Sequence, residues 1–205
     1  MDDASVGATL AGLEDVSNVL LLTSEFGAGC PETCGTLLEP SDGESVSVVG
    51  VAVAVTPDEW ASRVMERLSP PPTDVCVVAV GEETRSAATE SAGVTPTGDA
   101  CVKRVASASN LTEVGVRLTE CIEDAAADEL TLCFSSLTAL LPHVEIRLAF
   151  QFLNVLTSLV GANDGLAHYH LDPAAAEERD VAKLRPLFDA IVEQGADGDL
   201  VVRTR

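Results

Sequence analysis

The chain has 205 residues, with 12 Lys and Arg against 33 Asp and Glu, which gives a net charge of −21. A surface this negative repels phosphate groups, so neither nucleic acid nor an anionic membrane surface is expected as a partner. Hydrophobic residues make up 46% of the chain, which excludes an acidic disordered tail and suffices for the core of one domain over residues 1–205.

The charge imbalance comes with an unusual choice of residues. Lys103 and Lys183 are the only lysines, and aromatic residues make up 3% of the chain. In molar salt the Debye length shrinks to about 3 Å, so a surface of like charges is tolerated and keeps the protein soluble. This composition is typical of halophilic proteins from salt-accumulating archaea, and we interpret the charge as an adaptation to such a cytosol.

The sequence favours a location in the cytoplasm. The N-terminus, Met1-Asp2-Asp3, lacks the basic and apolar stretches of a secretory signal. The longest apolar run, 146–160, is shorter than the roughly 18 residues of a membrane span and contains Arg147. We therefore expect the six cysteines to be reduced thiols, with Cys76 and Cys133 as small core residues.

Predicted strands alternate with helices along the chain. The strands are short runs rich in Val and Leu, and most lack period-two alternation, which indicates a parallel sheet buried on both faces. They cover 18–23, 46–55, 75–80, 130–134 and 166–171, followed by an edge strand over 200–203.

The segments between the strands predict four helices. Thr56 and Asn110 are the expected N-caps of the first two. The third, from about 142 to 160, is apolar around much of its circumference, so we expect it to be largely buried. The fourth is expected over 172–192, with a bend at Pro186.

This alternation predicts the fold class. Strand, helix and strand in repetition indicate an α/β domain with a doubly wound, mainly parallel sheet flanked by helices and joined by right-handed crossovers. Two segments fall outside the pattern. They are an N-terminal extension over 1–16 and an irregular segment over 81–109 that is rich in Ser, Thr, Gly and Ala.

Five short segments carry a resemblance to a known family. They are LLLTSE at 20–25, TPDEW at 56–60, NLTEVG at 110–115, LCFSSLT at 132–138 and HYHLDP at 168–173. In this order and spacing the chain resembles the RecA-like ATPases of the KaiC and RadA type, in the P-loop NTPase superfamily, and specifically an uncharacterised haloarchaeal family of such domains. The resemblance covers nearly the whole chain and implies a RecA-like fold.

The loop after the first strand departs from the phosphate-binding loop of that superfamily. The motif G-x-x-x-x-G-K-[ST] uses glycines to admit the phosphates, lysine to neutralise them and a hydroxyl to hold Mg²⁺. The degenerate loop contains Gly27, Gly29, Glu32, Thr33 and Cys34. With Gly27 as the first glycine, the last three stand at the second glycine, the lysine and the Ser/Thr positions. Glu32 adds negative charge there, and the nearest lysine is Lys103.

Two further parts of the nucleotide site are missing. The magnesium aspartate of KaiC-like proteins ends a strand, and Ser135 stands at this position, where a hydroxyl is a poor ligand for a hard dication. The catalytic glutamate follows the second strand, where Thr56 and Pro57 stand. The resemblance therefore implies a scaffold with degenerate Walker motifs that has lost Mg-ATP hydrolysis, and we expect no catalytic residue and no cofactor.

His168-x-His170-x-Asp172 is the sharpest remaining cluster. Positions i, i+2 and i+4 of a strand share one face, so two imidazoles and a carboxylate can converge on a metal ion. Asp172 before Pro173 is also explained as a helix N-cap. We expect a structural role, with one histidine buried or hydrogen-bonded near the nucleotide cleft, and keep a metal site as the alternative.

Cys30 and Cys34 place two thiols at a predicted helix N-terminus, whose dipole lowers a thiol pKa. This arrangement allows a redox switch, but the spacing differs from C-x-x-C and Glu32 opposes thiolate formation. We expect the two cysteines to pack a short turn. Ser135 and Ser136 lack a surrounding G-x-S-x-G motif, and two serines at a strand end predict turn or cap residues.

Two functional hypotheses follow from the resemblance and from the missing residues. The first is a non-catalytic RecA/KaiC-like binding or regulatory module, in a signalling or transcription-control assembly, that associates with a protein partner or with itself. The alternative is an atypical nucleotide-binding protein with weak or no ATPase activity. Equilibrium ATP binding and phosphate release distinguish the two.

Overall fold

The computed structural model describes residues 10, 13, 16–24, 32–39, 45–53, 55–81, 100–195 and 199–205. Eight strands in these ranges form one sheet in the order β4-β3-β2-β5-β6-β1-β7-β8. The strands are β1 (Asn18–Leu22), β2 (Val46–Val53), β3 (Asp74–Val80), β4 (Ala100–Val105), β5 (Glu129–Ser135), β6 (Leu166–Leu171), β7 (Ala190–Gln194) and β8 (Leu200–Thr204). All neighbours are parallel except β7 and β8, which are antiparallel. The predicted fold class, including the C-terminal edge strand, is confirmed.

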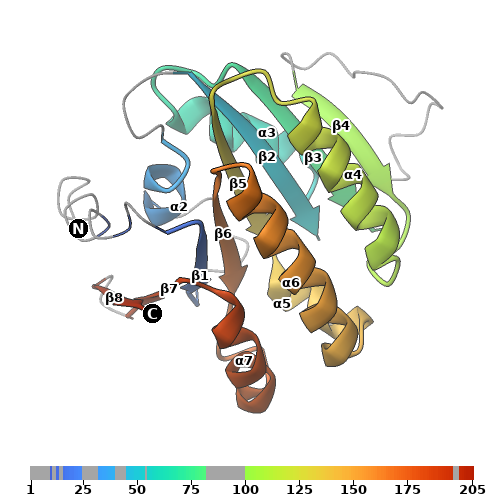
Figure 1. Ribbon diagram of the computed structural model, residues 1–205, viewed down its shortest axis with the longest axis vertical. Helices are drawn as coiled ribbons and strands as arrows, with labels where there is room; N and C mark the ends of the chain where they lie inside the picture. The colour runs from blue at the N-terminus through green and yellow to red at the C-terminus, as the bar shows by residue number, and fades with distance from the viewer. Residues whose placement is uncertain are drawn as a thin grey trace.

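Helices cover both faces of the sheet (Figure 1). One face is covered by α4 (Leu111–Glu123), α5 (Leu137–Leu140), α6 (Ile146–Ala162) and α7 (Glu178–Leu184), with the 3-10 turns η3 (Leu141–His143) and η4 (Arg185–Leu187). The other face is covered by α2 (Glu32–Thr36) and α3 (Pro57–Arg67). No helix in the described ranges is long and apolar enough to cross a bilayer.

Strand β6 divides its side chains between these two layers. Ala167, Tyr169 and Leu171 belong to the core beneath α4–α7. Because successive side chains of a strand point to opposite faces, His168 and His170 point toward α2 and α3. Both histidines are buried, with 0% and 6% of their surface exposed. The sheet therefore places two polar rings in the interior on the α2–α3 side.

A buried polar network joins β1 to α6, to β6 and to the residue before β7. The Asn18 amide Nδ2 donates to the Thr157 carbonyl oxygen at 3.1 Å, and the Tyr169 hydroxyl donates to Asn18 Oδ1 at 3.0 Å. The backbone N–H of Asn18 donates to Asp189 Oδ2 at 2.9 Å. Asn18 is 4% exposed, so its amide satisfies two polar groups that water does not reach.

The predicted helix caps are confirmed. The Thr56 side chain accepts a hydrogen bond from the Glu59 N–H at the start of α3. At the start of α4, Asn110 Oδ1 accepts from the Glu113 N–H at 3.2 Å, and Asn110 Nδ2 donates to Glu113 Oε2 at 2.9 Å. Both helices thus begin with a side chain that satisfies a backbone donor left without an intrahelical partner.

Replacing Asn110 by alanine is expected to lower the free energy of unfolding by about 1 kcal/mol, because the Glu113 N–H loses its acceptor. Urea unfolding followed by circular dichroism measures this change. Asn110→Asp keeps an acceptor oxygen and is the matched control, expected to stay within about 0.5 kcal/mol of the parent. Equal losses in the two variants would contradict the capping role.

Two strands lie where the sequence predicted none. β4 occupies the end of the segment predicted to be irregular, and its charged Lys103 and Arg104 are tolerated because it is an edge strand. β7 overlaps the end of the predicted helix 172–192, where pairing with the buried strand β1 replaces helix formation. The helix itself is shorter, since α7 begins at Glu178, so the prediction of Asp172 as its N-cap is wrong.

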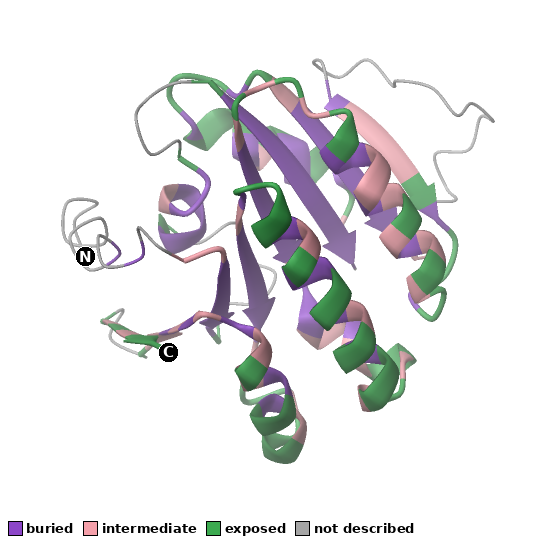
Figure 2. Ribbon diagram, viewed as in Figure 1, coloured by how far each residue is buried: buried purple, intermediate pink, exposed green. Residues whose placement is uncertain are grey.

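Helix α6 is less buried than the sequence predicted. Ala149, Leu153, Leu156 and Val160 pack on the sheet. Leu148 and Val155 are 49% and 66% exposed, and Figure 2 shows exposed segments along α6. We expect a helix that is apolar around its circumference to be enclosed, but α6 packs on the sheet with one face and exposes the opposite face to solvent.

The expectation of six reduced thiols is wrong for Cys34, Cys76 and Cys121, which are disulfide-bonded. Cys76 on β3 and Cys121 on α4 form a disulfide, with 5.8 Å between their Cα atoms. The helix α4 covers β3, which brings the two side chains within bonding range. Cys101 and Cys133 are free thiols.

Candidate functional site

The segment aligned with a phosphate loop leads into α2. Gly27, Gly29 and Cys30 lie outside the described residues. Glu32, the first residue of α2, is exposed, whereas Thr33 and Cys34 are buried. The side chains at the lysine and Ser/Thr positions of the motif are therefore turned into the protein.

The ends of β5 and β2 carry no carboxylate in the described structure. Ser135 ends β5, and the buried Ser136 caps α5 by accepting a hydrogen bond from the Ala139 N–H at 3.1 Å. The Ser135–Ser136 peptide bond is cis. After β2, Thr56 caps α3, and Glu59 forms an ion pair with Arg63. The prediction of turn or cap residues at Ser135 and Ser136 is confirmed for Ser136.

Lys103, the lysine nearest to the degenerate loop in sequence, lies far from α2 in the fold. It belongs to the edge strand β4, and β3, β2, β5 and β6 lie between this strand and β1. Its Nζ pairs with Asp124 Oδ2 at 3.1 Å and with Glu120 Oε2 at 3.3 Å. Lys103 therefore does not replace the missing phosphate-loop lysine.

Four metal-ligating side chains meet between α2 and the sheet. They are Cys34 from α2, Cys133 from β5, and His168 and His170 from β6, and one donor atom of each lies within 4.8 Å of the others. All four are buried. Cys34 Sγ lies 3.7 Å from Cys133 Sγ and 3.0 Å from His168 Nε2. The two histidine rings meet edge to face, with 5.1 Å between their centroids. We call these residues the Cys/His cluster.

Strand pairing explains how residues so distant in sequence meet. β5 and β6 are parallel neighbours, and Cys133 pairs in register with His168. Two residues in register point to the same face of a sheet, so both side chains point toward α2. Cys34 completes the cluster from above because α2 packs on this face.

The cluster is neutral at ordinary pH. Burial lowers the pKa of His168 well below its usual value, with a smaller contribution from the neighbouring His170, and burial lowers the pKa of His170 to about 4. Burial raises the pKa of the Cys133 thiol to about 12, against a smaller lowering by the Trp60 hydrogen bond. His168 Nδ1 and His170 Nε2 have no hydrogen-bond partner in the described structure. Cys34 is disulfide-bonded.

Trp60 packs beside the cluster. Its ring lies over Gly50 on β2, where an added Cβ would come within 2.5 Å of a ring carbon. Gly50 pairs in register with Cys133, so the indole is placed next to the thiol to which it is hydrogen-bonded. The absence of a side chain at residue 50 thus makes room for the ring that covers Cys133.

Sequence reasoning found part of this cluster. It singled out His168, His170 and Asp172, and the structure brings the two histidines together. Asp172 lies outside the group, since its Oδ1 accepts from the Ala174 N–H and its own N–H donates to Thr138 Oγ1. Cys34 and Cys133 were missed as metal-ligating partners, because their contact depends on which strands are neighbours. His143 lies in η3 and is exposed.

Comparison with known proteins places this fold. A protein from Pyrococcus horikoshii OT3, solved in a structural study as PH0250, is similar with a TM-score of 0.55 and 11% identity over 92% of this chain and 86% of that chain. The flagellar accessory protein FlaH from Methanocaldococcus jannaschii is similar with a TM-score of 0.50 and 14% identity, over 92% and 77%. These likenesses show the fold alone, which is RecA-like as the resemblance implied.

Sequence comparison gives a family but no activity. No protein with a curated description is significantly similar to the chain. Residues 16–194 match the family of unknown function DUF7504, and because this match covers most of the chain, the protein belongs to that family.

Proposed function

We propose that the chain is a RecA-like module that binds a protein partner and does not hydrolyse Mg-ATP. The observation that carries this proposal is an apolar groove between α4 and α6, open to solvent on the face of the molecule opposite the Cys/His cluster. A regulatory role in an assembly, as the sequence suggested, fits a module that recognises a partner and carries out no chemistry of its own.

The residues at the nucleotide positions support the second half of the proposal. Cys34 is directed into the sheet toward Cys133 and His168, so the Ser/Thr position of the loop offers no ligand toward a phosphate. Ser135 stands where a magnesium carboxylate is needed, and a neutral hydroxyl gives little charge compensation for Mg²⁺. Phosphoryl transfer depends on such positioned charges, so their loss removes the main source of catalysis.

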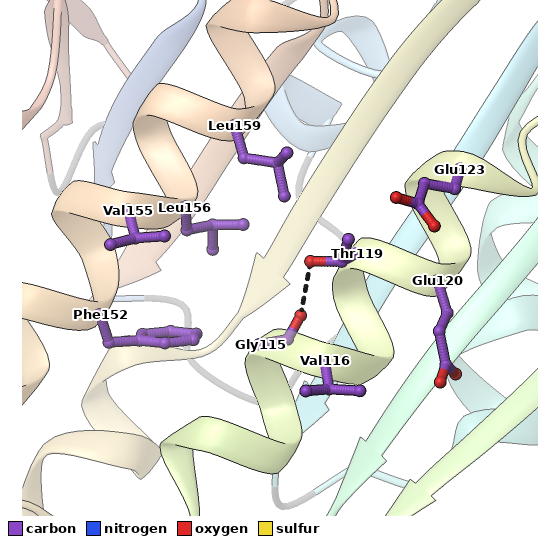
Figure 3. A pocket seen from close by; sticks show the side chains of 9 residues that line it. All are labelled: Gly115, Val116, Thr119, Glu120, Glu123, Phe152, Val155, Leu156 and Leu159. Atoms are coloured by element: carbon purple, nitrogen blue, oxygen red, sulfur yellow. Dashed lines mark hydrogen bonds between the residues drawn. The ribbon is translucent and has the colours of Figure 1, made fainter.

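The groove itself is built by two neighbouring helices (Figure 3). Phe152, Val155, Leu156 and Leu159 project from α6 toward α4. On α4, Gly115 has no side chain and leaves room opposite Phe152. The groove has a volume of about 420 Å³, and its rim includes Val116, which is 51% exposed. Leu156 is buried and forms the floor, whereas Val116 and Val155 are exposed at the rim, and exposed apolar residues beside a cavity are typical of interaction sites.

The occupant that fits this groove is an amphipathic helix of a partner protein with a basic flank. A channel between two helices accepts the apolar face of a third helix. Glu120 and Glu123 line the α4 wall, and Glu120 already pairs with Lys103 and Arg117, so the local charge that a partner meets comes from Glu123. Like charges across an interface are unfavourable, so an acidic segment is disfavoured and a basic flank is favoured.

Equilibrium binding of ATP, with and without Mg²⁺ in buffer of high KCl concentration, tests the absence of nucleotide chemistry. We expect no saturable ATP binding and no release of phosphate above the protein-free blank. Micromolar binding or measurable turnover would overturn this part and favour the alternative of an atypical nucleotide-binding protein.

Site-specific photo-crosslinking tests the groove. A benzophenone amino acid replaces Val155 in the groove or, as a matched control, Met65, which is 42% exposed on α3 at the other face. We expect residue 155 to crosslink an amphipathic helical segment of another protein, and the exposed position 65 not to do so. Equal crosslinking from both positions, or crosslinking of a second copy of this chain, would contradict the proposed occupant.

A further inference from the structure

We propose that Cys34, Cys133, His168 and His170 bind one Zn²⁺ ion when the disulfide that holds Cys34 is reduced. The proposal is independent of the α4–α6 groove, because the Cys/His cluster lies on the α2–α3 side of the sheet. It assigns a metal site, with a redox condition for its occupation, to a protein whose family has no known function.

The donor set selects the metal. Two sulfur and two nitrogen donors form the Cys₂His₂ set that structural zinc sites use. The cluster offers no carboxylate or carbonyl ligand among its four members, so Mg²⁺ and Ca²⁺, which require oxygen ligands, are disfavoured. Two thiolates also balance the charge of Zn²⁺, which matters because all four side chains are buried.

The distances suit a tetrahedral ion. Zn–S bonds of about 2.3 Å and Zn–N bonds of about 2.0 Å place tetrahedral donors roughly 3.3 to 3.8 Å apart. The two sulfurs of Cys34 and Cys133 are 3.7 Å apart, and Cys34 Sγ is 3.0 Å from His168 Nε2. All four donor atoms lie within 4.8 Å of one another, so small side-chain rotations close the remaining gaps.

Unsatisfied nitrogens supply an independent reason for a ligand. Among the described residues, His168 Nδ1 and His170 Nε2 are buried without a hydrogen-bond partner, a state that is unfavourable for a polar group. A metal ion bound to His170 Nε2 gives this lone pair a partner in the absence of water, while His168 offers the Nε2 atom that lies beside Cys34 Sγ.

The oxidation state of Cys34 sets whether the ion binds. A dithiol reductant transfers two electrons to the disulfide: its own sulfurs form a disulfide, the S–S bond of Cys34 breaks, and two protein thiols result. Zn²⁺ then displaces one proton each from Cys34 and Cys133, which go to solvent, and the sulfur lone pairs bind the ion. An oxidising disulfide reverses the exchange, and Zn²⁺ leaves as the S–S bond forms again.

The test uses the full chain, stripped of metal with a chelator and prepared in reduced and oxidised form under anaerobic conditions. Zn²⁺ is titrated against a competing chromophoric chelator, and Co²⁺ is used as a spectroscopic probe. We expect reduced protein to bind one ion per chain with thiolate-to-cobalt charge-transfer bands and tetrahedral d–d bands. Oxidised protein should bind more than about 100-fold more weakly, since altering outer-shell partners alone costs 10- to 100-fold.

Matched variants separate the site from other thiols and histidines. Cys133→Ser and His170→Gln should lose tight binding and the cobalt bands, whereas Cys101→Ser and His143→Gln should keep both. Cys76→Ala with Cys121→Ala removes the other disulfide and should leave the redox dependence unchanged. Because the wild-type comparison of reduced and oxidised protein needs no substitution, a variant that fails to fold does not weaken the test.

Two results would overturn the proposal. Reduced, folded wild type without thiolate-to-cobalt bands shows that the cluster binds no metal of this class. Equal zinc affinity in reduced and oxidised protein shows that Cys34 is not a ligand. Failure of the proposed partner-binding function would be seen in the crosslinking experiment and would change neither result.

Discussion

Replacing Asn18 by alanine is expected to lower the free energy of unfolding by about 4 kcal/mol. The change leaves the Tyr169 hydroxyl and the Thr157 carbonyl without their partner, and each stranded buried group costs about 1–3 kcal/mol. Asn18 also lies in a strand flanked on both sides by β6 and β7, so water cannot readily replace the amide. Urea unfolding monitored by circular dichroism measures the loss.

Tyr169→Phe is the control for this network. It removes the hydroxyl and leaves only Asn18 Oδ1 unpaired, so we expect a loss of about 1 kcal/mol. In the double variant the two losses should sum to more than the observed change, because the groups that interact are removed together. Strict additivity would show that the Asn18–Tyr169 contact contributes nothing to stability.

Gly50→Ala is expected to destabilise the protein by about 3 kcal/mol. The new Cβ would lie 2.5–2.7 Å from three carbons of the Trp60 ring, closer than any real contact. Trp60 is a buried residue of α3 with 6% of its surface exposed, so the ring cannot move away without disturbing the core, and overpacking costs typically 1–3 kcal/mol. Trp60 is the only tryptophan, so its fluorescence reports this displacement directly during urea unfolding.

A second substitution tests whether the Trp60 ring is the cause of the destabilisation by Gly50→Ala. Combining Gly50→Ala with Trp60→Leu, which removes the ring that clashes, should cost less than the two single changes together. A clash of the new methyl group with a side chain other than Trp60 would not give this non-additive result. A sum equal to the separate losses would show that the methyl group disturbs something other than the indole.

Local chemistry allowed much of the fold to be predicted from the sequence. Thr56 and Asn110 cap helices through contacts with residues three positions along the chain, which sequence spacing fixes. The buried central strands were predictable because each is a continuous run of apolar residues. The Ser136 cap and the absence of carboxylates at the strand ends were likewise visible from residue types.

Features that depend on distant neighbours were not predicted. The sequence predicts helix where β7 lies, because strand formation there depends on pairing with β1, which precedes it by about 170 positions and leaves no local signal. The Cys/His cluster needs β5 beside β6 and α2 above them, which no local pattern specifies. The sequence also predicts too much burial for α6, because an apolar composition does not show which face of a helix is left in contact with solvent.

The order of the sheet gives a reason for the positions of four of the twelve basic residues. The chain has 12 Lys and Arg, yet β4 at one edge carries Lys103 and Arg104, and β8 at the other carries Arg203, followed by Arg205. An edge strand offers unpaired backbone groups to any other strand, and charged side chains there oppose such pairing. These four basic residues thus oppose the pairing of either open edge with a strand of another molecule.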